Sequence, residues 1–188
     1  VYYFNIIVKD QSNNKSAYSI NSQITLDSTA PVTGNNGAIT LGMALYNSIT
    51  INWIKSTDTL SEQSNLQYLI YRSNSNNIDT VANIETNGTA VGSYSSNIAT
   101  LSITNLIDSF SYYFNIIVRD EQGNKTTYST KSVTTNDSTP PTAGGDGTMT
   151  VNNVASTSVT LNWTKATDSI SSQSALQYLA YYSTDNNI

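Results

Sequence analysis

The sequence predicts an all-β protein built from tandem antiparallel β-sandwich domains of seven strands each. One observation is local: apolar and polar residues alternate over short runs separated by polar turn residues, which is typical of strands with one buried face. The other is long-range: residues 112–120 (YYFNIIVRD) repeat residues 2–10 (YYFNIIVKD) at an offset of 110 positions. A period of that length indicates a repeat of whole domains rather than a solenoid of short units.

The offset of 110 holds along the whole chain without a gap. Residues 48–53 (SITINW) correspond to residues 158–163 (SVTLNW), and residues 63–69 (QSNLQYL) correspond to residues 173–179 (QSALQYL). The segments DSTAP at 27–31 and DSTPP at 137–141 also match, and proline makes such segments stiff and extended. These two segments are the predicted connectors between domains.

The connectors divide the chain into three parts. Residues 1–29 are predicted to be the last two strands of a preceding repeat, residues 30–139 a complete repeat, and residues 140–188 the first three strands of a following repeat. Because the chain starts with Val1 and inside a strand, we expect it to be an internal fragment of a longer, exported polypeptide.

Seven strands are expected in the complete repeat, at residues 38–41, 49–53, 66–70, 90–94, 101–103, 112–118 and 126–134. In the sixth strand the alternation places Tyr112, Phe114, Ile116 and Val118 in the core. Residues 76–88 are expected to be irregular or to form one short helical turn. Residues 120–124 are expected to form a hairpin turn in which Gly123 takes a positive φ.

Several of these strands resemble the fibronectin type III family. Ile49-x-Ile51-x-Trp53 resembles the second strand of that family with its core tryptophan, and residues 159–163 repeat the pattern. Residues 68–72 resemble the third strand, and Leu106 followed six residues later by Tyr112 resembles the tyrosine-corner strand. The resemblance covers the whole chain. It implies an immunoglobulin-like sandwich in the tandem form found in bacterial extracellular proteins.

The composition excludes several classes of function. The net charge is −5 with only 8 Lys and Arg residues, so no nucleic-acid partner is expected. The chain has no His and no Cys, which excludes Ser-His-Asp triads and thiolate chemistry. No apolar run is long enough for a membrane span. Asp58 and Glu62 are four residues apart, but Ser172 replaces the glutamate in the next repeat, so we expect no enzyme.

Five acidic side chains are expected at one end of the sandwich, where the incoming connector, the loop after the second strand and the last hairpin loop come together. They are Asp27, Asp58, Glu62, Asp120 and Glu121. Because Ca²⁺ prefers carboxylate and carbonyl oxygens, one interpretation is a calcium site. The other is that each aspartate caps its own turn through hydrogen bonds to the backbone. No other cofactor is expected.

Three side chains on the sheet face opposite the core are candidates for contact with a partner. They are Tyr71, Tyr113 and Ile117, which recur as Tyr181, Tyr3 and Ile7. An exposed face with this composition suits stacking on a sugar or docking of another copy. The alternative is that tyrosine is simply a good strand former on an exposed sheet.

These observations favour a non-catalytic structural or adhesive repeat segment of a bacterial cell-surface protein or extracellular filament. Such a segment is expected to act through sheet faces, sheet edges or domain ends, with neighbouring repeats, copies of itself, surface polysaccharide or protein as partners. The alternative is a spacer or accessory module of a secreted carbohydrate-active enzyme with its catalytic domain elsewhere. Both interpretations place the chain outside the cell or on the cell surface.

Overall fold

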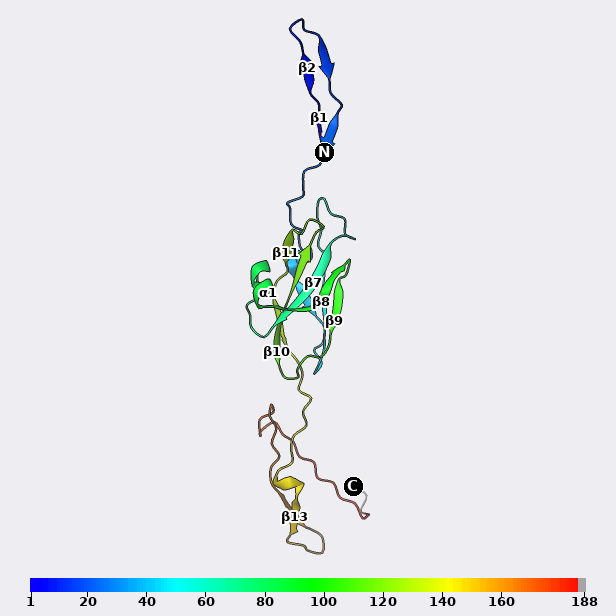
Figure 1. The fold of residues 1–188 in the computed structure, drawn as a ribbon. Coiled ribbons are helices and arrows are strands. Elements are labelled where there is room, and N and C mark those ends of the chain that lie inside the picture. The colour runs from blue at the N-terminus through cyan, green and yellow to red at the C-terminus, as the bar shows by residue number, and fades with distance from the viewer. Residues whose placement is uncertain (186–188) are drawn as a thin grey trace.

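The computed structural model of the protein describes residues 1–185 and has three parts arranged end to end (Figure 1). A β-sandwich occupies the middle. A thin β-ribbon lies on its N-terminal side, and a segment with one β-hairpin lies on its C-terminal side. The seven strands predicted for the complete repeat are all found in the middle part.

Two antiparallel sheets form the sandwich. The smaller sheet contains β5 (Ile39–Leu41), β6 (Ile49–Trp53) and β9 (Thr100–Ile103), in that order. The larger contains β8 (Thr89–Ser96), β7 (Gln67–Ser73) and β10 (Ser111–Arg119). The free edge of β10 pairs with β11 (Lys125–Thr127) and then with β12 (Lys131–Thr134). The seventh predicted strand is therefore divided into β11 and β12, which both pair with β10.

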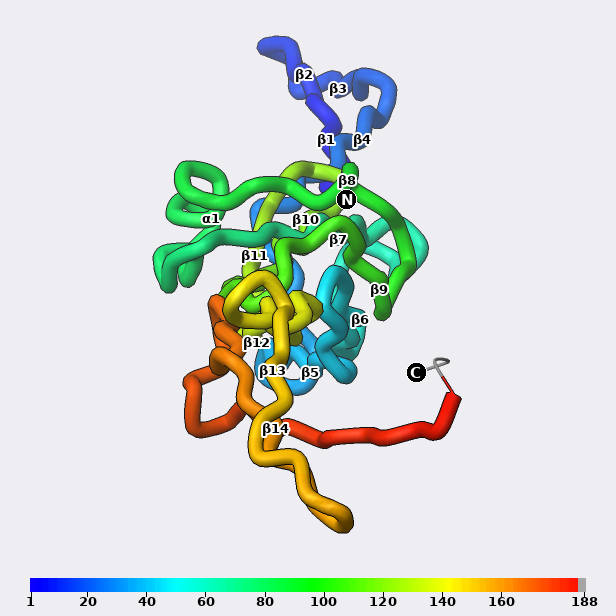
Figure 2. Tube along the Cα trace, turned by 90° about the horizontal axis from the view of Figure 1, so that it is seen from below, coloured from blue at the N-terminus to red at the C-terminus, as the bar shows by residue number. Residues whose placement is uncertain are grey.

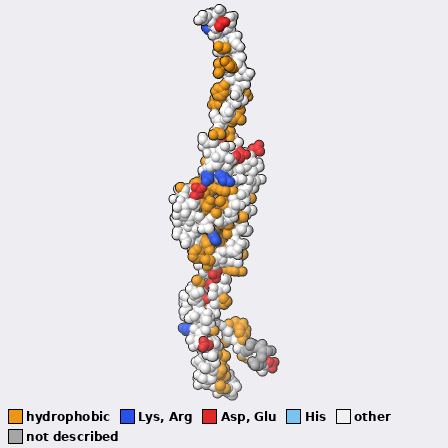
Figure 3. All heavy atoms as spheres, viewed as in Figure 1, with side chains coloured by type: hydrophobic (Ala, Val, Ile, Leu, Met, Phe, Trp, Pro, Cys, Tyr) orange, Lys and Arg blue, Asp and Glu red, His pale blue; other side chains and the backbone are white. Residues whose placement is uncertain are grey.

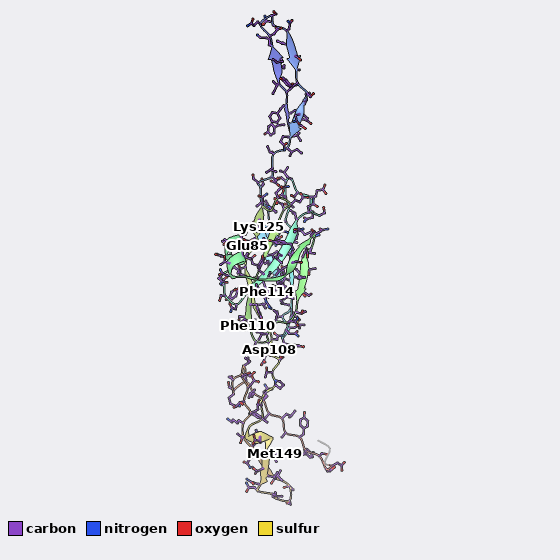
Figure 4. The ribbon with its side chains drawn as sticks, viewed as in Figure 1. Glu85, Asp108, Phe110, Phe114, Lys125 and Met149 are labelled. Carbon is purple, nitrogen blue, oxygen red and sulfur yellow. The ribbon has the colours of Figure 1, made fainter. Side chains whose placement is uncertain are left out.

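The core lies between the two sheets, on the faces that the alternation predicts. Tyr112, Phe114, Ile116 and Val118 of β10 are all at most 6% exposed. They pack with residues of the smaller sheet, and Figure 4 shows Phe114 in the middle of the sandwich. Across the core, the ring of Trp53 lies 5.8 Å from that of Tyr68. Each such side chain contributes about 1.5–3 kcal/mol when it is fully buried, so this cluster is what holds the two sheets together.

The connection between β7 and β8 contains a short helix, α1 (Val81–Asn87). The helix begins after Thr80, whose hydroxyl oxygen accepts a hydrogen bond from the backbone N–H of Asn83 at 3.2 Å. Figure 2 shows α1 on the side of the sandwich away from β6, against the outer face of the larger sheet. An ion pair of 2.5 Å between Glu85 and Lys125 joins α1 to β11 (Figure 4).

The expected exposure of Ile117 is wrong, and Tyr71 and Tyr113, which were expected on the same exposed face, are partly buried. Ile117 is fully buried in a second apolar cluster with Ile78 and Ile84, and both tyrosines pack against that cluster. The physical reason is that residues 76–88 fold back over this face of the sheet. The part of this face around Ile117 is thus covered by the chain itself.

The N-terminal ribbon repeats the geometry of the last two strands of the sandwich. In it β1 (Tyr2–Phe4) pairs with β4 (Asn21–Gln23), and β2 (Ile7–Lys9) pairs with β3 (Lys15–Ala17). Every paired position lies 110 residues before its counterpart in the pairing of β10 with β12 and β11. The environment differs: Phe4 is 58% exposed, whereas Phe114 is fully buried. Figure 3 shows the resulting apolar patches along the ribbon.

The C-terminal segment repeats the start of the sandwich in the same way. Its hairpin of β13 (Met149–Asn152) and β14 (Thr160–Trp163) has the register of β5 and β6. Trp163 lies 5.7 Å from Tyr178, close to the 5.8 Å between Trp53 and Tyr68. The third strand predicted here, around residues 176–180, forms no ladder, because the segment offers no counterpart of β8 or β10 to pair with it. The predicted third part extends to residue 188, and its residues 186–188 lie outside the part of the chain that the structure describes.

Candidate metal centre

Three aspartates from separate segments meet at the N-terminal end of the sandwich. Asp27 lies in the connector before Pro31, Asp58 in the loop between β6 and β7, and Asp120 in the turn between β10 and β11. One carboxylate oxygen of each lies within 4.8 Å of the other two. Asp120 is 3% exposed, and the other two are partly buried. Within residues 1–185, these three aspartates are the group that could hold a cation.

Each aspartate of this trio uses one oxygen to cap its own turn. The Oδ1 atom of Asp27 accepts a hydrogen bond from the backbone N–H of Thr29 at 2.9 Å. That of Asp58 accepts from the N–H groups of Leu60 and Ser61 at 2.8 and 3.0 Å. That of Asp120 accepts from the N–H of Asn124 at 2.9 Å. Turn capping therefore accounts for half of the carboxylate oxygens in the trio.

The second carboxylate oxygens of the three aspartates differ in their hydrogen bonding. Oδ2 of Asp120 accepts from the side-chain amide of Asn124 at 2.7 Å, and the same amide donates to the backbone carbonyl of Asp27 at 3.3 Å. Asn124 thereby ties the connector to the hairpin. Oδ2 of Asp27 and Oδ2 of Asp58 are buried and accept no hydrogen bond. A buried carboxylate oxygen without a donor is costly, so these two atoms need an explanation.

No basic side chain neutralises the trio. Arg119, next to Asp120 in sequence, instead donates two hydrogen bonds to Gln67 and stacks on the ring of Tyr94 at 3.8 Å. In the part of the chain that is described, the single ion pair is the distant one between Lys125 and Glu85. Two carboxylates at this spacing repel by about 3 kcal/mol at an effective dielectric constant of about 20. The charge of the trio is therefore uncompensated by protein groups.

Glu62 and Glu121, which the sequence pattern placed in the same cluster, are not part of the trio. Both are exposed. Glu121 accepts hydrogen bonds from the side chains of Asn65 and Ser61, which turns its carboxylate to the outside of the loop. The sequence could place these residues at the correct end of the sandwich. It could not show which way their longer side chains point.

Two buried tyrosines position the loop that carries Asp58. The hydroxyl of Tyr68 accepts a hydrogen bond from the backbone N–H of Ser56 at 2.9 Å. The hydroxyl of Tyr128 donates to the carbonyl of Ile54 at 2.7 Å and lies 2.9 Å from Oγ of Ser56. Burial raises the pKa of Tyr128 to about 12, so this hydroxyl remains a hydrogen-bond donor well into the alkaline range. These hydrogen bonds from the core fix the loop that carries Asp58, and they require no bound ligand.

The fold and its internal bonds define the class of the protein. The hydroxyl of Tyr112 accepts a hydrogen bond from the backbone N–H of Ile107 at 3.0 Å, which is the bond of a tyrosine corner. With seven antiparallel strands in two sheets and a core tryptophan, the middle part of the chain has a fibronectin type III-like β-sandwich fold. Within the described part of the chain, no helix is long and apolar enough to span a membrane.

Comparison with known proteins gives a bacterial relative and several solved domains of this type. The chain is 31% identical over 179 residues to Exoglucanase B of Cellulomonas fimi. The match covers 89% of this chain but only 14% of that protein. No protein-family model matches the chain.

Solved structures with a similar fold include two human domains. The fn3 domain of contactin 1 is 16% identical, with a TM-score of 0.44, and the match covers 68% of this chain and 93% of that domain. The FN3 domain of collagen XX is 18% identical, with a TM-score of 0.38, and covers 61% of this chain and all of that domain (100%).

Proposed function

We propose that the chain is a non-catalytic structural segment of a bacterial extracellular protein, in which fibronectin type III-like repeats follow one another as stiff spacers. The observation that carries the proposal is the repetition of geometry at an offset of 110 residues. Residues 1–29 keep the strand register of β10 to β12, and residues 140–185 keep that of β5 and β6. We take them as parts of the preceding and following repeats.

The exposed apolar side chains of the flanking parts support this assignment. Trp163 is 48% exposed, whereas its counterpart Trp53 is 4% exposed. Tyr2 is 62% exposed, against 6% for Tyr112. Residues that repeat a core pattern but lie open are best explained by a core that is completed by further chain. We take neighbouring repeats as the partners of these two faces.

The available chemistry favours a mechanical role over a catalytic one. The sequence has no His and no Cys, and the trio of aspartates has no general acid beside it. Proline-containing connectors between folded units give reach and stiffness instead. The match to 14% of Exoglucanase B favours one setting in particular, a spacer or accessory module of a secreted carbohydrate-active enzyme.

A second candidate setting is a cell-surface or filament protein that adheres through its repeats. The same repetition of strand register at an offset of 110 residues favours it, because an array of whole domains also suits a surface stalk or filament. The two settings make different predictions for the protein in its natural length. A spacer gives single particles with a separate globular domain, and a filament gives fibres in negative-stain microscopy.

The proposed function is tested by assaying the 188-residue chain itself. We expect no hydrolysis of soluble glucans and an elongated, monodisperse particle in small-angle scattering. Hydrolysis that survives repurification and disappears on denaturation would contradict the non-catalytic role. A compact particle would contradict the role of a spacer.

A further inference from the structure

We propose that Asp27, Asp58 and Asp120 bind one Ca²⁺ ion, which fastens the connector to the sandwich. Turn capping explains one oxygen of each carboxylate but leaves Oδ2 of Asp27 and Oδ2 of Asp58 buried and without a donor. Two buried, unpartnered carboxylate oxygens close to a third, nearly fully buried carboxylate require a positive charge. The protein supplies none at that position, so a cation from solution is the missing partner.

The chemistry of the trio selects a hard cation. All three side chains offer oxygen, and the chain has no His or Cys to attract a softer transition metal. The separations of up to 4.8 Å suit oxygens on opposite sides of Ca²⁺, which are about 2.4 Å from the ion. Mg²⁺ demands a near-ideal octahedron and gives up its waters reluctantly, so a site of three carboxylates from three separate segments suits it less well.

The rest of the coordination shell is available from water. Ca²⁺ takes six to eight oxygens, and three carboxylates supply only part of them. Two open depressions flank the trio: one of about 430 Å³ is lined in part by Asp120, and one of about 410 Å³ is lined in part by Asp27. Water in these depressions lies beside Asp120 and Asp27 and can complete the shell of a bound ion, whereas the two unpartnered oxygens are themselves shielded from solvent. A partly hydrated site of this kind belongs to the weak, extracellular range of calcium affinities.

The internal repeat separates the trio from its acidic neighbours. Asp27, Asp58 and Asp120 recur as Asp137, Asp168 and Asp10, whereas Glu62 becomes Ser172 and Glu121 becomes Gln11. Oδ1 of Asp168 again caps its turn, with bonds of 2.8 and 2.6 Å to the backbone N–H groups of Ile170 and Ser171. Its Oδ2 is again buried and unpartnered. The capped turn with one unpartnered oxygen is thus a property of this loop in each repeat, and what the complete repeat adds is the approach of two further carboxylates.

The position of the ion gives it a mechanical consequence. Asp27 belongs to the connector, whereas Asp58 and Asp120 belong to loops of the sandwich. An ion shared among them fixes the direction in which the chain enters the domain. The proposal that Ca²⁺ binds depends only on the geometry of the trio. The further proposal that the ion stiffens an array of repeats rests on the proposed function.

Calcium titration of the 188-residue protein, first freed of metal with a chelator, tests the site. By calorimetry we expect about one Ca²⁺ per chain with a Kd of about 10⁻⁴–10⁻³ M, and a melting temperature that rises with Ca²⁺ concentration. Asp58→Asn keeps the capping oxygen and replaces the unpartnered one, so it should weaken binding by at least about tenfold without lowering the metal-free melting temperature.

Two matched variants separate a site from general attraction to a negative surface. Glu62→Gln removes a charge from the same loop, and Asp168→Asn removes the counterpart of Asp58 where the trio is incomplete; both should bind Ca²⁺ as the parent does. No heat and no change in melting temperature up to about 10 mM Ca²⁺ would overturn the proposal, because extracellular sites are half-filled below that level. Equal weakening by Glu62→Gln and Asp58→Asn would overturn it too. Binding without a change in scattering profile would leave the site intact and contradict only the stiffening.

Discussion

The side-chain amide of Asn115 donates a hydrogen bond of 2.6 Å to the backbone carbonyl of Ile78. Asn115 lies in the middle of β10 on the face opposite the core, and its side chain is fully buried. The hydroxyl of Thr130 donates to the same carbonyl at 2.9 Å. The two bonds hold the segment before α1 over the larger sheet, so a polar residue organises the second apolar cluster.

Replacing Asn115 with Ala is expected to lower the free energy of unfolding by about 1–3 kcal/mol, since buried partners lose their bonds. Thr127, whose hydroxyl donates to Oδ1 of Asn115 at 2.8 Å, is left without that acceptor. Urea unfolding monitored by circular dichroism measures the change. Asn74→Ala, at an exposed position, is the control. A loss equal to that of the control would show that the segment is held by apolar packing alone.

Ile117→Ala should cost about 2–5 kcal/mol of unfolding free energy, because it opens a cavity beneath α1. The residue is fully buried with Ile78 and Ile84. Met43→Ala, at a position that is 85% exposed, should change the stability by less than about 0.5 kcal/mol. Both stability changes are measured from the midpoint of denaturant unfolding. If the two variants behave alike, the helix does not cover the sheet in solution.

Tyr112→Phe removes the hydroxyl of the tyrosine corner and should destabilise the sandwich by about 1 kcal/mol. The lost bond is the one from the backbone N–H of Ile107, while the ring remains in the core. Amide hydrogen exchange gives a local readout: the N–H of Ile107 should exchange faster than in the parent protein. Unchanged protection of that amide would mean that another acceptor replaces the hydroxyl.

Alkaline pH should destabilise the sandwich through Tyr128. Burial raises the pKa of this hydroxyl from 10.0 to about 12, so the folded state holds the proton more tightly than the unfolded state. The resulting stabilisation is complete below about pH 10 and is lost as the pH rises through about 12. Tyr128→Phe should be less stable at neutral pH, because the bond to Ile54 is gone, but should lose less stability over this window. If the free energy of unfolding falls equally with pH in both proteins, the alkaline destabilisation is not due to Tyr128.

The sequence predicts the sandwich well because the signals are local and repeated. The alternation in residues 112–118 identified the core face of β10, and the turn with Gly123 at a φ of 86° is found where the pattern placed it. Of the two alternatives for residues 76–88, irregular structure or one short helical turn, the helical one is found, as α1. These features depend on side-chain period and on backbone freedom, both of which can be read one segment at a time.

The same alternation failed on the outer face of β10 for a physical reason. Asn115 and Ile117 are buried because a segment about 30–40 residues away in sequence folds over them. A two-residue period indicates which side chains share a face, but not whether a helix covers that face. The presence of Ile117 among polar neighbours was the available signal, and it indicated a covered face within the chain rather than a partner.

The acidic end of the sandwich was predicted only in outline. Topology brought the three segments together, and the structure selected Asp27, Asp58 and Asp120 from the five candidates. The short aspartate side chains stay close to the turns that they cap, so their carboxylates converge. The longer side chains of Glu62 and Glu121 reach solvent. Comparing the two repeats, in which only the aspartates recur, is the sequence signal that distinguishes them.

Single-molecule force spectroscopy tests the central claim most directly, namely that each 110-residue unit is a separate sandwich in a mechanical array. Copies of residues 30–139 are joined in tandem through their own proline-containing connector and stretched. The account predicts one unfolding event per copy, each lengthening the chain by roughly 300–350 Å, the extended length of one repeat less its folded span. Extension without discrete events, or events that span several copies at once, would contradict it.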